Sequence, residues 1–230
     1  MKCVILAGGK GTRISELTKD IPKPMIKVAG KPILYHIMKH YSKHGFNEFI
    51  LAVGYKKNII SNYFKSKKFS KWKVSIVDTG QKTMTGGRLK RLKKFIGGET
   101  FMLTYGDGLS NVNLKELLNF HKKNNKIATL TSVRPLARFG AIKINGTKVT
   151  YFKEKSKLDE GWINGGFFVF EPKIFQYIKG DKTFLEREPL QQISKNGQLL
   201  AYKHEGFWQC MDTLRDKNLL EKELKKRKIL

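Results

Sequence analysis

Short apolar runs alternate with amphipathic stretches along the first half of the chain. After Pro32, apolar residues recur at helical spacing and give that stretch one buried face. This repeated strand–helix order predicts a parallel sheet with right-handed crossovers, in which ligands bind beyond the carboxyl ends of the strands. The predicted strands are Lys2–Ala7, Phe49–Val53, Lys73–Val77, Phe101–Tyr105 and Ile127–Val133, and further helices are predicted over 58–64 and 113–124. A second glycine turn with a basic residue, Thr83–Arg88, is expected to open another helix through Leu92 and Phe95.

The second half of the chain has a different pattern. Apolar residues on both sides of Asn145-Gly146 predict a β-hairpin over 141–152. Because neither a linker nor a repeat interrupts the sequence, we expect one α/β domain over residues 1–230. Its mixed, mostly parallel sheet becomes more antiparallel toward the C-terminus. The remaining predicted strands are Phe167–Phe170 and Leu199–Lys203, and the predicted helices are Pro172–Tyr177, Pro189–Lys195 and Thr213–Lys226.

A glycine-rich loop follows the first predicted strand, with the sequence Leu6-Ala7-Gly8-Gly9-Lys10-Gly11-Thr12-Arg13. Its glycines let the backbone turn sharply and bring N–H groups close to phosphates, and Arg13 adds a planar fork of donors. The loop is not a P-loop, because Gly-Lys-Ser/Thr is missing. It is not the dinucleotide fingerprint either, because Ile14 stands where the third glycine belongs. Taken alone, it is also compatible with a strand-to-helix turn that binds nothing.

Two prolines, Pro22 and Pro24, flank Lys23. They argue against a helix here and predict a stiff, extended segment that fixes the position of the lysine. A lysine that only faces solvent needs no such support. A rigid turn with an incidental lysine is the alternative.

Two aspartates lie at places where a metal ion could be held. Asp107 lies between two glycines at the end of the strand Phe101–Tyr105, where its carboxylate can hold a divalent ion or simply form an Asp-Gly turn. Asp212 precedes the last predicted helix, so it can complete a metal site or cap that helix. The residues alone leave both alternatives open.

The chain is strongly basic, with 46 Lys and Arg against 19 Asp and Glu and a formal net charge of +27. Such charge fits a general lysine bias, phosphorylated substrates or nucleic-acid binding, but an aromatic–basic RNA motif is missing. The sequence has no apolar run of roughly 18 residues and no signal peptide. Its two cysteines, Cys3 and Cys210, fit a reducing compartment. We therefore expect a cytoplasmic protein without a membrane span.

Together these motifs resemble the signature of the sugar-1-phosphate nucleotidylyltransferase family. The glycine loop and Pro22-Lys23-Pro24-Met25 are typical of the family as a whole. Further blocks are similar to its glucose-1-phosphate cytidylyltransferase branch and span nearly the whole chain. They are Asp78-Thr79-Gly80, Met84–Arg91, Thr104–Gly108, Arg138–Ala141, Ile163–Phe168 and Gly206–Lys217.

The resemblance implies a Rossmann-like three-layer fold and transfer of CMP from CTP to α-D-glucose 1-phosphate, for surface polysaccharide biosynthesis. It implies that about residues 1–133 bind the nucleotide and about 134–230 the sugar. Mg²⁺ and basic side chains, with Lys23 and Arg13 as the catalytic ones, would neutralise charge as pyrophosphate leaves. The nucleotide would be bound by Leu6, Ala7, Gly8, Gly9, Lys10, Gly11, Thr12, Arg13, Lys23, Thr83, Arg88 and Gly106, Mg²⁺ by Asp107 and Asp212, and the sugar phosphate by Gly140, Glu154, Lys155, Asn164 and Gly165.

The chain departs from the family pattern mainly in one connector. The family usually carries a longer segment before Asp78, whereas here Phe64 to Trp72 is short and lysine-rich. We expect a homo-oligomer, whose assembly would differ if the longer segment makes subunit contacts. Ser156 and Cys210 replace prolines of the family without removing a charge. Two alternatives are the same chemistry with another nucleotide or acceptor, and a non-catalytic nucleic-acid-binding protein.

Overall fold

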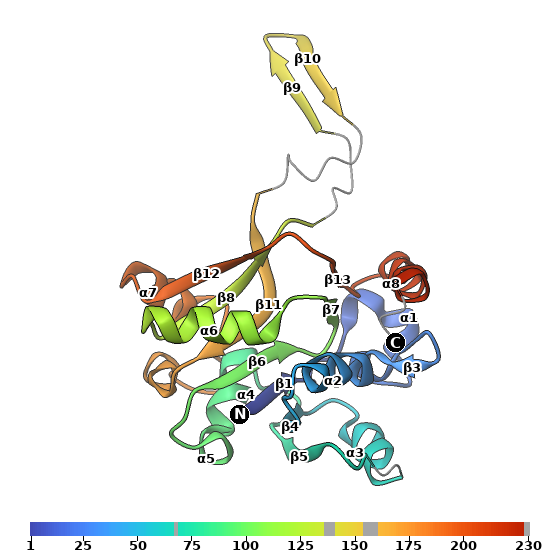
Figure 1. The fold of residues 1–230 in the computed structure, drawn as a ribbon. Coiled ribbons are helices and arrows are strands. Elements are labelled where there is room, and N and C mark those ends of the chain that lie inside the picture. Colours follow the sequence, from blue (N-terminus) through green and yellow to red (C-terminus); the bar gives the residue numbers. More distant parts are fainter. Residues whose placement is uncertain (67–68, 136–140, 154–160, 228–230) are drawn as a thin grey trace.

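The computed structural model describes residues 1–66, 69–135, 141–153 and 161–227. A seven-stranded sheet crosses the molecule in the order β12-β8-β11-β6-β1-β4-β5 (Figure 1). The strands are β1 (Lys2–Leu6), β4 (Glu48–Val53), β5 (Lys73–Asp78), β6 (Phe101–Tyr105), β8 (Ala128–Val133), β11 (Ile163–Phe170) and β12 (Leu199–His204).

The sheet is mixed and mostly parallel, as predicted. β1 pairs in parallel with β4 and β6, β4 with β5, and β8 with β12. Only β11 runs antiparallel to its neighbours β6 and β8. The strand predicted over Phe167–Phe170 begins earlier, at Ile163. Its register against β8 shifts between Asn164 and Phe168, so the two glycines lie within an irregularity of the strand.

Helices cover both faces of the sheet. Successive residues of each strand point to opposite sides, so each strand presents apolar side chains to the helices on both faces. On one face, Ile5 packs with α2 (Ile33–Lys43), α3 (Lys57–Lys65), α6 (Leu114–Asn124) and α8 (Leu214–Arg227). On the other, Val4 packs with α4 (Thr85–Arg91), α5 (Lys93–Ile96), η3 (Pro172–Tyr177) and α7 (Glu188–Lys195). The predicted three-layer architecture is therefore confirmed.

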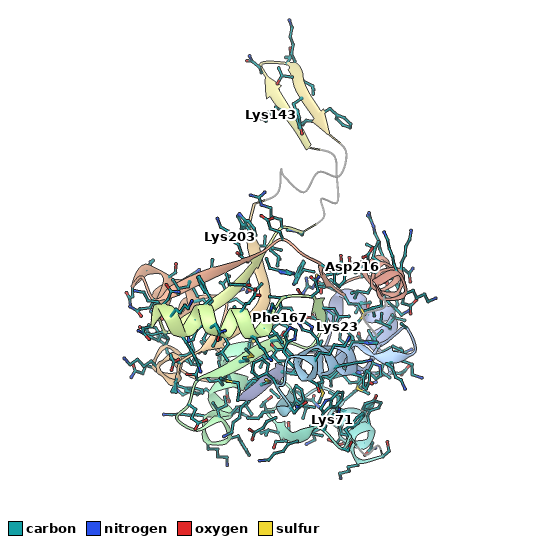
Figure 2. The ribbon with its side chains drawn as sticks, viewed as in Figure 1. Lys23, Lys71, Lys143, Phe167, Lys203 and Asp216 are labelled. Carbon is teal, nitrogen blue, oxygen red and sulfur yellow. The ribbon has the colours of Figure 1, made fainter. Side chains whose placement is uncertain are left out.

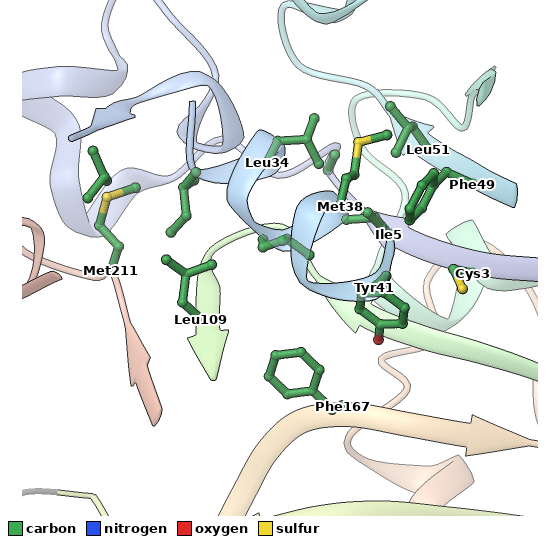
Figure 3. Close-up of a cluster of buried hydrophobic side chains, with 14 of the residues drawn as sticks. Cys3, Ile5, Leu34, Met38, Tyr41, Phe49, Leu51, Leu109, Phe167 and Met211 are labelled. Atoms are coloured by element: carbon green, nitrogen blue, oxygen red, sulfur yellow. The ribbon is translucent and has the colours of Figure 1, made fainter. Parts of the chain in front are cut away.

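The larger core cluster is centred on α2. Figure 3 shows Leu34, Met38 and Tyr41 of this helix on the side that faces Ile5 and Phe49 of the sheet. The three helix residues are among the apolar positions whose spacing predicted the helix after Pro32. They and the two strand residues are all buried. The predicted cap at Asn113 is also present, since its side chain accepts hydrogen bonds from the N–H groups of Lys115 and Glu116.

One prediction of local structure was wrong, and two predicted helices differ in detail. The segment at Lys23 is not extended: Lys23–Met25 forms a 3-10 turn (η2), closed by a bond from Met25 N to Pro22 O of 2.8 Å. Pro24 is tolerated because such a turn does not need its missing N–H. The predicted helix Pro172–Tyr177 is present as a 3-10 helix. The helix expected after the second glycine turn already begins at Thr85 and divides into α4 and α5 at Leu92.

Smaller elements complete the fold. The predicted hairpin forms from β9 (Ala141–Asn145) and β10 (Lys148–Lys153), and it stands apart from the sheet in Figure 1. Within the described ranges, no helix combines the length and the apolar character needed to cross a membrane. The other short elements are η1 (Thr12–Ile14), α1 (Ser15–Thr18), β2 (Lys27–Val28), β3 (Lys31–Pro32), β7 (Gly108–Ser110) and β13 (Trp208–Cys210).

Candidate active site

A cleft of about 1160 Å³ opens beyond the carboxyl ends of β1 and β6. This is the edge of the sheet where the strand order predicted a ligand site. Most of the candidate residues named from the sequence line it: Leu6, Ala7, Gly8, Gly9, Lys10, Gly11, Thr12, Arg13, Lys23, Thr83, Arg88, Gly106, Asp107, Asn164 and Asp212.

The glycine loop is held from behind at Gly8. The carbonyl oxygen of Gly8 accepts hydrogen bonds from Tyr55 N at 3.1 Å and from Arg88 Nη2 at 2.9 Å. Farther along the loop, Gly11 has a φ of +66°, a left-handed conformation that favours glycine. Its carbonyl accepts a hydrogen bond from Thr18 Oγ1 at 3.1 Å. The loop is therefore fixed before any ligand binds.

Arg88 lies buried under this loop, where it forms part of the wall of the cleft. Besides Gly8, its guanidinium donates to Thr79 Oγ1 and Gly80 O, both at 2.7 Å, and to Val53 O at 3.3 Å. These acceptors lie at or just beyond the ends of β4 and β5. One side chain thus ties together three strand ends at the rim of the cleft.

Lys23 joins the two aspartates that the sequence singled out. Its Nζ lies 2.7 Å from Asp107 Oδ2 and 2.6 Å from Asp212 Oδ1. Figure 2 labels Lys23 within the whole molecule. Arg13 Nη1 lies 2.5 Å from the other oxygen of Asp212. Burial alone would lower the pKa of Lys23, but Asp107 and Asp212 together raise it above its ordinary value. The lysine is therefore a permanent cation at neutral pH.

The position of Asp212 resolves the choice between a helix cap and a site residue. The start of α8 is capped by Thr213 and Asp216: Asp216 N donates to Thr213 Oγ1 at 3.2 Å, and Thr213 N donates to Asp216 Oδ2 at 2.9 Å. This reciprocal arrangement is a capping box. The carboxylate of Asp212 points instead to Lys23 and Arg13.

A short antiparallel pair brings the two aspartates together. Cys210 of β13 pairs with Gly108 of β7, and Met211 N donates to Asp107 O at 2.9 Å. The Cys210 thiol lies beside Asp212. Burial, reinforced by the negative charge of Asp212, raises the pKa of Cys210 to about 12, so the sulfur stays protonated. It is a poor metal ligand in that state.

Residues that the sequence did not single out as site residues also line the cleft. Tyr105 donates its hydroxyl hydrogen to Glu186 Oε1 at 2.6 Å, and Thr85 donates to Glu186 Oε2 at 2.6 Å. Phe184, Trp208 and Gln81 also line the cleft. Tyr105 directly precedes the Gly106-Asp107 motif, which was a usable signal. Nothing in the local sequence marks Glu186.

The predicted sugar-phosphate residues are only partly visible. Asn164 lines the cleft, and its side chain accepts a hydrogen bond from Gly166 N at 2.9 Å. Gly165 is not among the lining residues; its carbonyl accepts a hydrogen bond from Trp208 Nε1 at 2.7 Å. Gly140, Glu154 and Lys155 lie outside the described residues.

A family model described as nucleotidyl transferase matches residues 2–214. The chain belongs to the nucleotidyl transferase family. The relatives with known names indicate the branch of the family to which the chain is most similar. It is 47% identical to the glucose-1-phosphate cytidylyltransferase of Salmonella typhimurium, over 96% of this chain and 95% of that one. It is 45% identical to the probable glucose-1-phosphate cytidylyltransferase of Bacillus subtilis, over 96% and 94%.

Solved structures place the fold in the same group. HddC from Yersinia pseudotuberculosis superposes on this nucleotidyl transferase with a TM-score of 0.78 at 26% identity, over 97% of this chain and 99% of that one. The same protein has been solved in complex with GMP-PN. The resemblance to the sugar-1-phosphate nucleotidylyltransferases, and to their cytidylyltransferase branch, is therefore confirmed. The alignment with the Salmonella relative runs over 243 positions, more than the 230 residues here, so that relative has residues that this chain lacks.

The two aspartates of this nucleotidyl transferase suit a hard divalent cation. Both offer carboxylate oxygens within hydrogen-bond distance of one nitrogen, so the two residues together would be able to hold such a cation. Among the described residues, no group of three or more His, Cys, Asp or Glu could hold a metal. Further ligands would therefore be water and phosphate oxygens, which is how Mg²⁺ is usually bound beside nucleotides.

Proposed function

We propose that this enzyme transfers a cytidylyl group from CTP to α-D-glucose 1-phosphate, releasing CDP-glucose and pyrophosphate. One observation carries the proposal most: Lys23, Asp107 and Asp212 converge in the same cleft as a rigid glycine loop. Relatives that are 45–47% identical over nearly the whole chain, with the cytidylyltransferase name, support the choice of substrates.

The reaction needs positioning and neutralisation of charge more than it needs a nucleophilic side chain. An oxygen of the sugar phosphate attacks the α-phosphorus of CTP in line, the bond to the β-phosphate oxygen breaks, and pyrophosphate leaves. In this proposal the loop Leu6–Arg13 cradles the triphosphate with its N–H groups. Lys23 donates to the α-phosphate, and Arg13 donates to the outer phosphates, where negative charge accumulates.

Asp107 and Asp212 would hold a Mg²⁺ ion. When bound, the ion supplies neutralisation of phosphate charge and a template for the triphosphate. The carboxylates themselves fix where that charge sits, and β7 and β13 hold them there through their pairing.

The sugar phosphate would occupy the side of the cleft built from the second part of the chain, about residues 134–230. Asn164 faces the cleft there. We keep Gly140, Glu154, Lys155 and Gly165 as proposed sugar-phosphate residues on the strength of the motifs alone. Thr83 and Arg88 remain proposed nucleotide residues, with the base expected near Thr83. A cytoplasmic, homo-oligomeric enzyme remains our prediction.

A release assay for pyrophosphate tests the substrates directly. Purified protein with Mg²⁺ is given each of CTP, UTP, GTP, ATP and dTTP with glucose 1-phosphate, mannose 1-phosphate and other sugar 1-phosphates. The pair CTP and glucose 1-phosphate is expected to give the largest kcat/KM. A larger value for a different pair would keep the chemistry and replace the substrate, a real alternative because HddC has been solved with a guanine nucleotide analogue. Release with none of the pairs would remove the proposed activity.

A further inference from the structure

The ammonium group of Lys23 occupies the point where the two candidate metal ligands converge. Its side chain is 8% exposed, and the carboxylates of Asp107 and Asp212 are 27% and 14% exposed. Two short charge-assisted hydrogen bonds, of 2.7 and 2.6 Å, hold it there. A divalent cation that bridged the same oxygens would take the same position.

We infer that Lys23 holds the place of the metal ion in the nucleotide-free enzyme, so that the metal enters only together with the triphosphate. The inference rests on the proposed metal site of Asp107 and Asp212. It gives Lys23 a second task, which precedes its contact with the nucleotide: the same side chain first closes the metal site and is then drawn to the phosphates.

The balance of charge in the cleft favours this order. Lys23 and Arg13 offset Asp107 and Asp212, so the four side chains are formally neutral. A divalent ion that arrived alone would add two positive charges beside Lys23, in a protein whose net charge is already +27. A triphosphate brings the missing negative charge and offers phosphate oxygens to both basic side chains.

Lys23 can make this move without rearranging the fold. Its Cα is fixed in the η2 turn, while its ammonium lies at the end of a flexible four-carbon chain with three donors. Other groups around the pair do not compete for the ion. The sulfur of Cys210 lies 3.8 Å from Asp212 Oδ2, and Asp216 is engaged with the backbone N–H groups of Asp212 and Thr213.

Binding of Mn²⁺, followed by the electron paramagnetic resonance signal of the free ion, tests the inference without turnover. Mn²⁺ shares the preference of Mg²⁺ for oxygen ligands. Lys23→Met removes the charge and keeps the length of the side chain. We expect it to bind Mn²⁺ at least tenfold more tightly than wild type when no nucleotide is present. Lys82→Met, on an exposed cleft residue, removes the same unit of charge and should behave as wild type.

A thermal melt gives an independent readout. Mn²⁺ alone should raise the Tm of Lys23→Met, and of a second variant, Lys23→Gln, but not that of wild type. Wild type should gain tight Mn²⁺ binding when a non-hydrolysable CTP analogue is added. Lys23→Arg keeps the charge and should stay as weak as wild type.

Three results would overturn the inference: tight Mn²⁺ binding by nucleotide-free wild type, equally weak binding by both neutral variants, or an equal gain in Lys82→Met. Wild type alone can give the first of these, so the test does not depend on the variants folding. None of these measurements requires catalysis. Failure of the pyrophosphate assay would therefore count against the proposed function and leave the metal result standing.

Discussion

Replacing Gly8 by alanine should damage the enzyme through Arg88. A Cβ atom at Gly8 would lie 2.1 Å from Arg88 Nη1 and 2.5 Å from its Cζ. Ordinary contacts between such atoms are about 3.5 Å, so the guanidinium must withdraw by about 1.4 Å. That movement would also strain the hydrogen bonds that Nη1 donates to Val53, Thr79 and Gly80.

The cost follows from the bonds that this movement breaks. The hydrogen bond from Arg88 Nη2 to Gly8 O, now 2.9 Å, would lengthen beyond a useful distance. A hydrogen bond to a charged group contributes about 1.5–3 kcal/mol, so losing one and weakening another gives about 2–4 kcal/mol of lost stability. The loop would also be released at Gly8, and we expect the KM for CTP to rise by roughly tenfold, about 1.4 kcal/mol.

Gly9 supplies the matched control. A Cβ atom added there meets no described atom within 4 Å, so Gly9→Ala should unfold in urea within about 0.5 kcal/mol of wild type. Equal losses of stability in the two variants would refute the reasoning. In an Arg88→Met background the clash is relieved, and Gly8→Ala should then cost much less. Additive losses in that double-mutant cycle would also refute it.

Three further outcomes are expected. Lys23→Ala should lower kcat by roughly 100- to 1000-fold while CTP binding, measured by calorimetry, weakens less than tenfold; equal losses would argue against a transition-state role. Asp107→Asn should lose at least roughly a hundredfold of Mg²⁺-dependent turnover, whereas Asp181→Asn, whose carboxylate pairs with Arg91, should keep it. Burial, helped by His44 and Lys43, lowers the pKa of His40 from 6.5 to about 4. The unfolded chain therefore takes up that proton first as the pH falls below 6.5, and stability drops by about 1.4 kcal/mol between pH 8 and 5.5. In His40→Gln, the free energy of unfolding measured in urea should no longer show this fall between pH 8 and 5.5. An unchanged pH dependence would contradict the lowered pKa.

The sequence was informative wherever a signal is local. Helical spacing after Pro32, the cap at Asn113 and the apolar strand before Gly8 each depend on a few neighbouring residues, and each was predicted correctly. The topology rule for repeated strand–helix units then placed the cleft at the correct edge of the sheet.

The errors arose where distant packing decides between local alternatives. Asp212 looked equally good as a helix cap because the capping box of Thr213 and Asp216 becomes evident only when α8 is seen. Lys23 was expected on an extended segment because the rules for proline consider only the residue next to each proline. The observed turn depends instead on a hydrogen bond between two residues farther apart, Pro22 and Met25. The burial of Arg88 under Gly8 could not be predicted either, because it depends on the ends of three separate strands.

The pairing of β7 with β13 has a consequence for how activity arises during synthesis. Asp107 leaves the ribosome long before Asp212, and until β13 docks the acidic pair is incomplete and Lys23 has only one partner. On the proposed roles of Asp107 and Asp212, a nascent chain that already contains the whole glycine loop is expected to be inert. Turnover would then begin only after the last strand has folded back onto the middle of the polypeptide, and the appearance of activity would report completion of the fold.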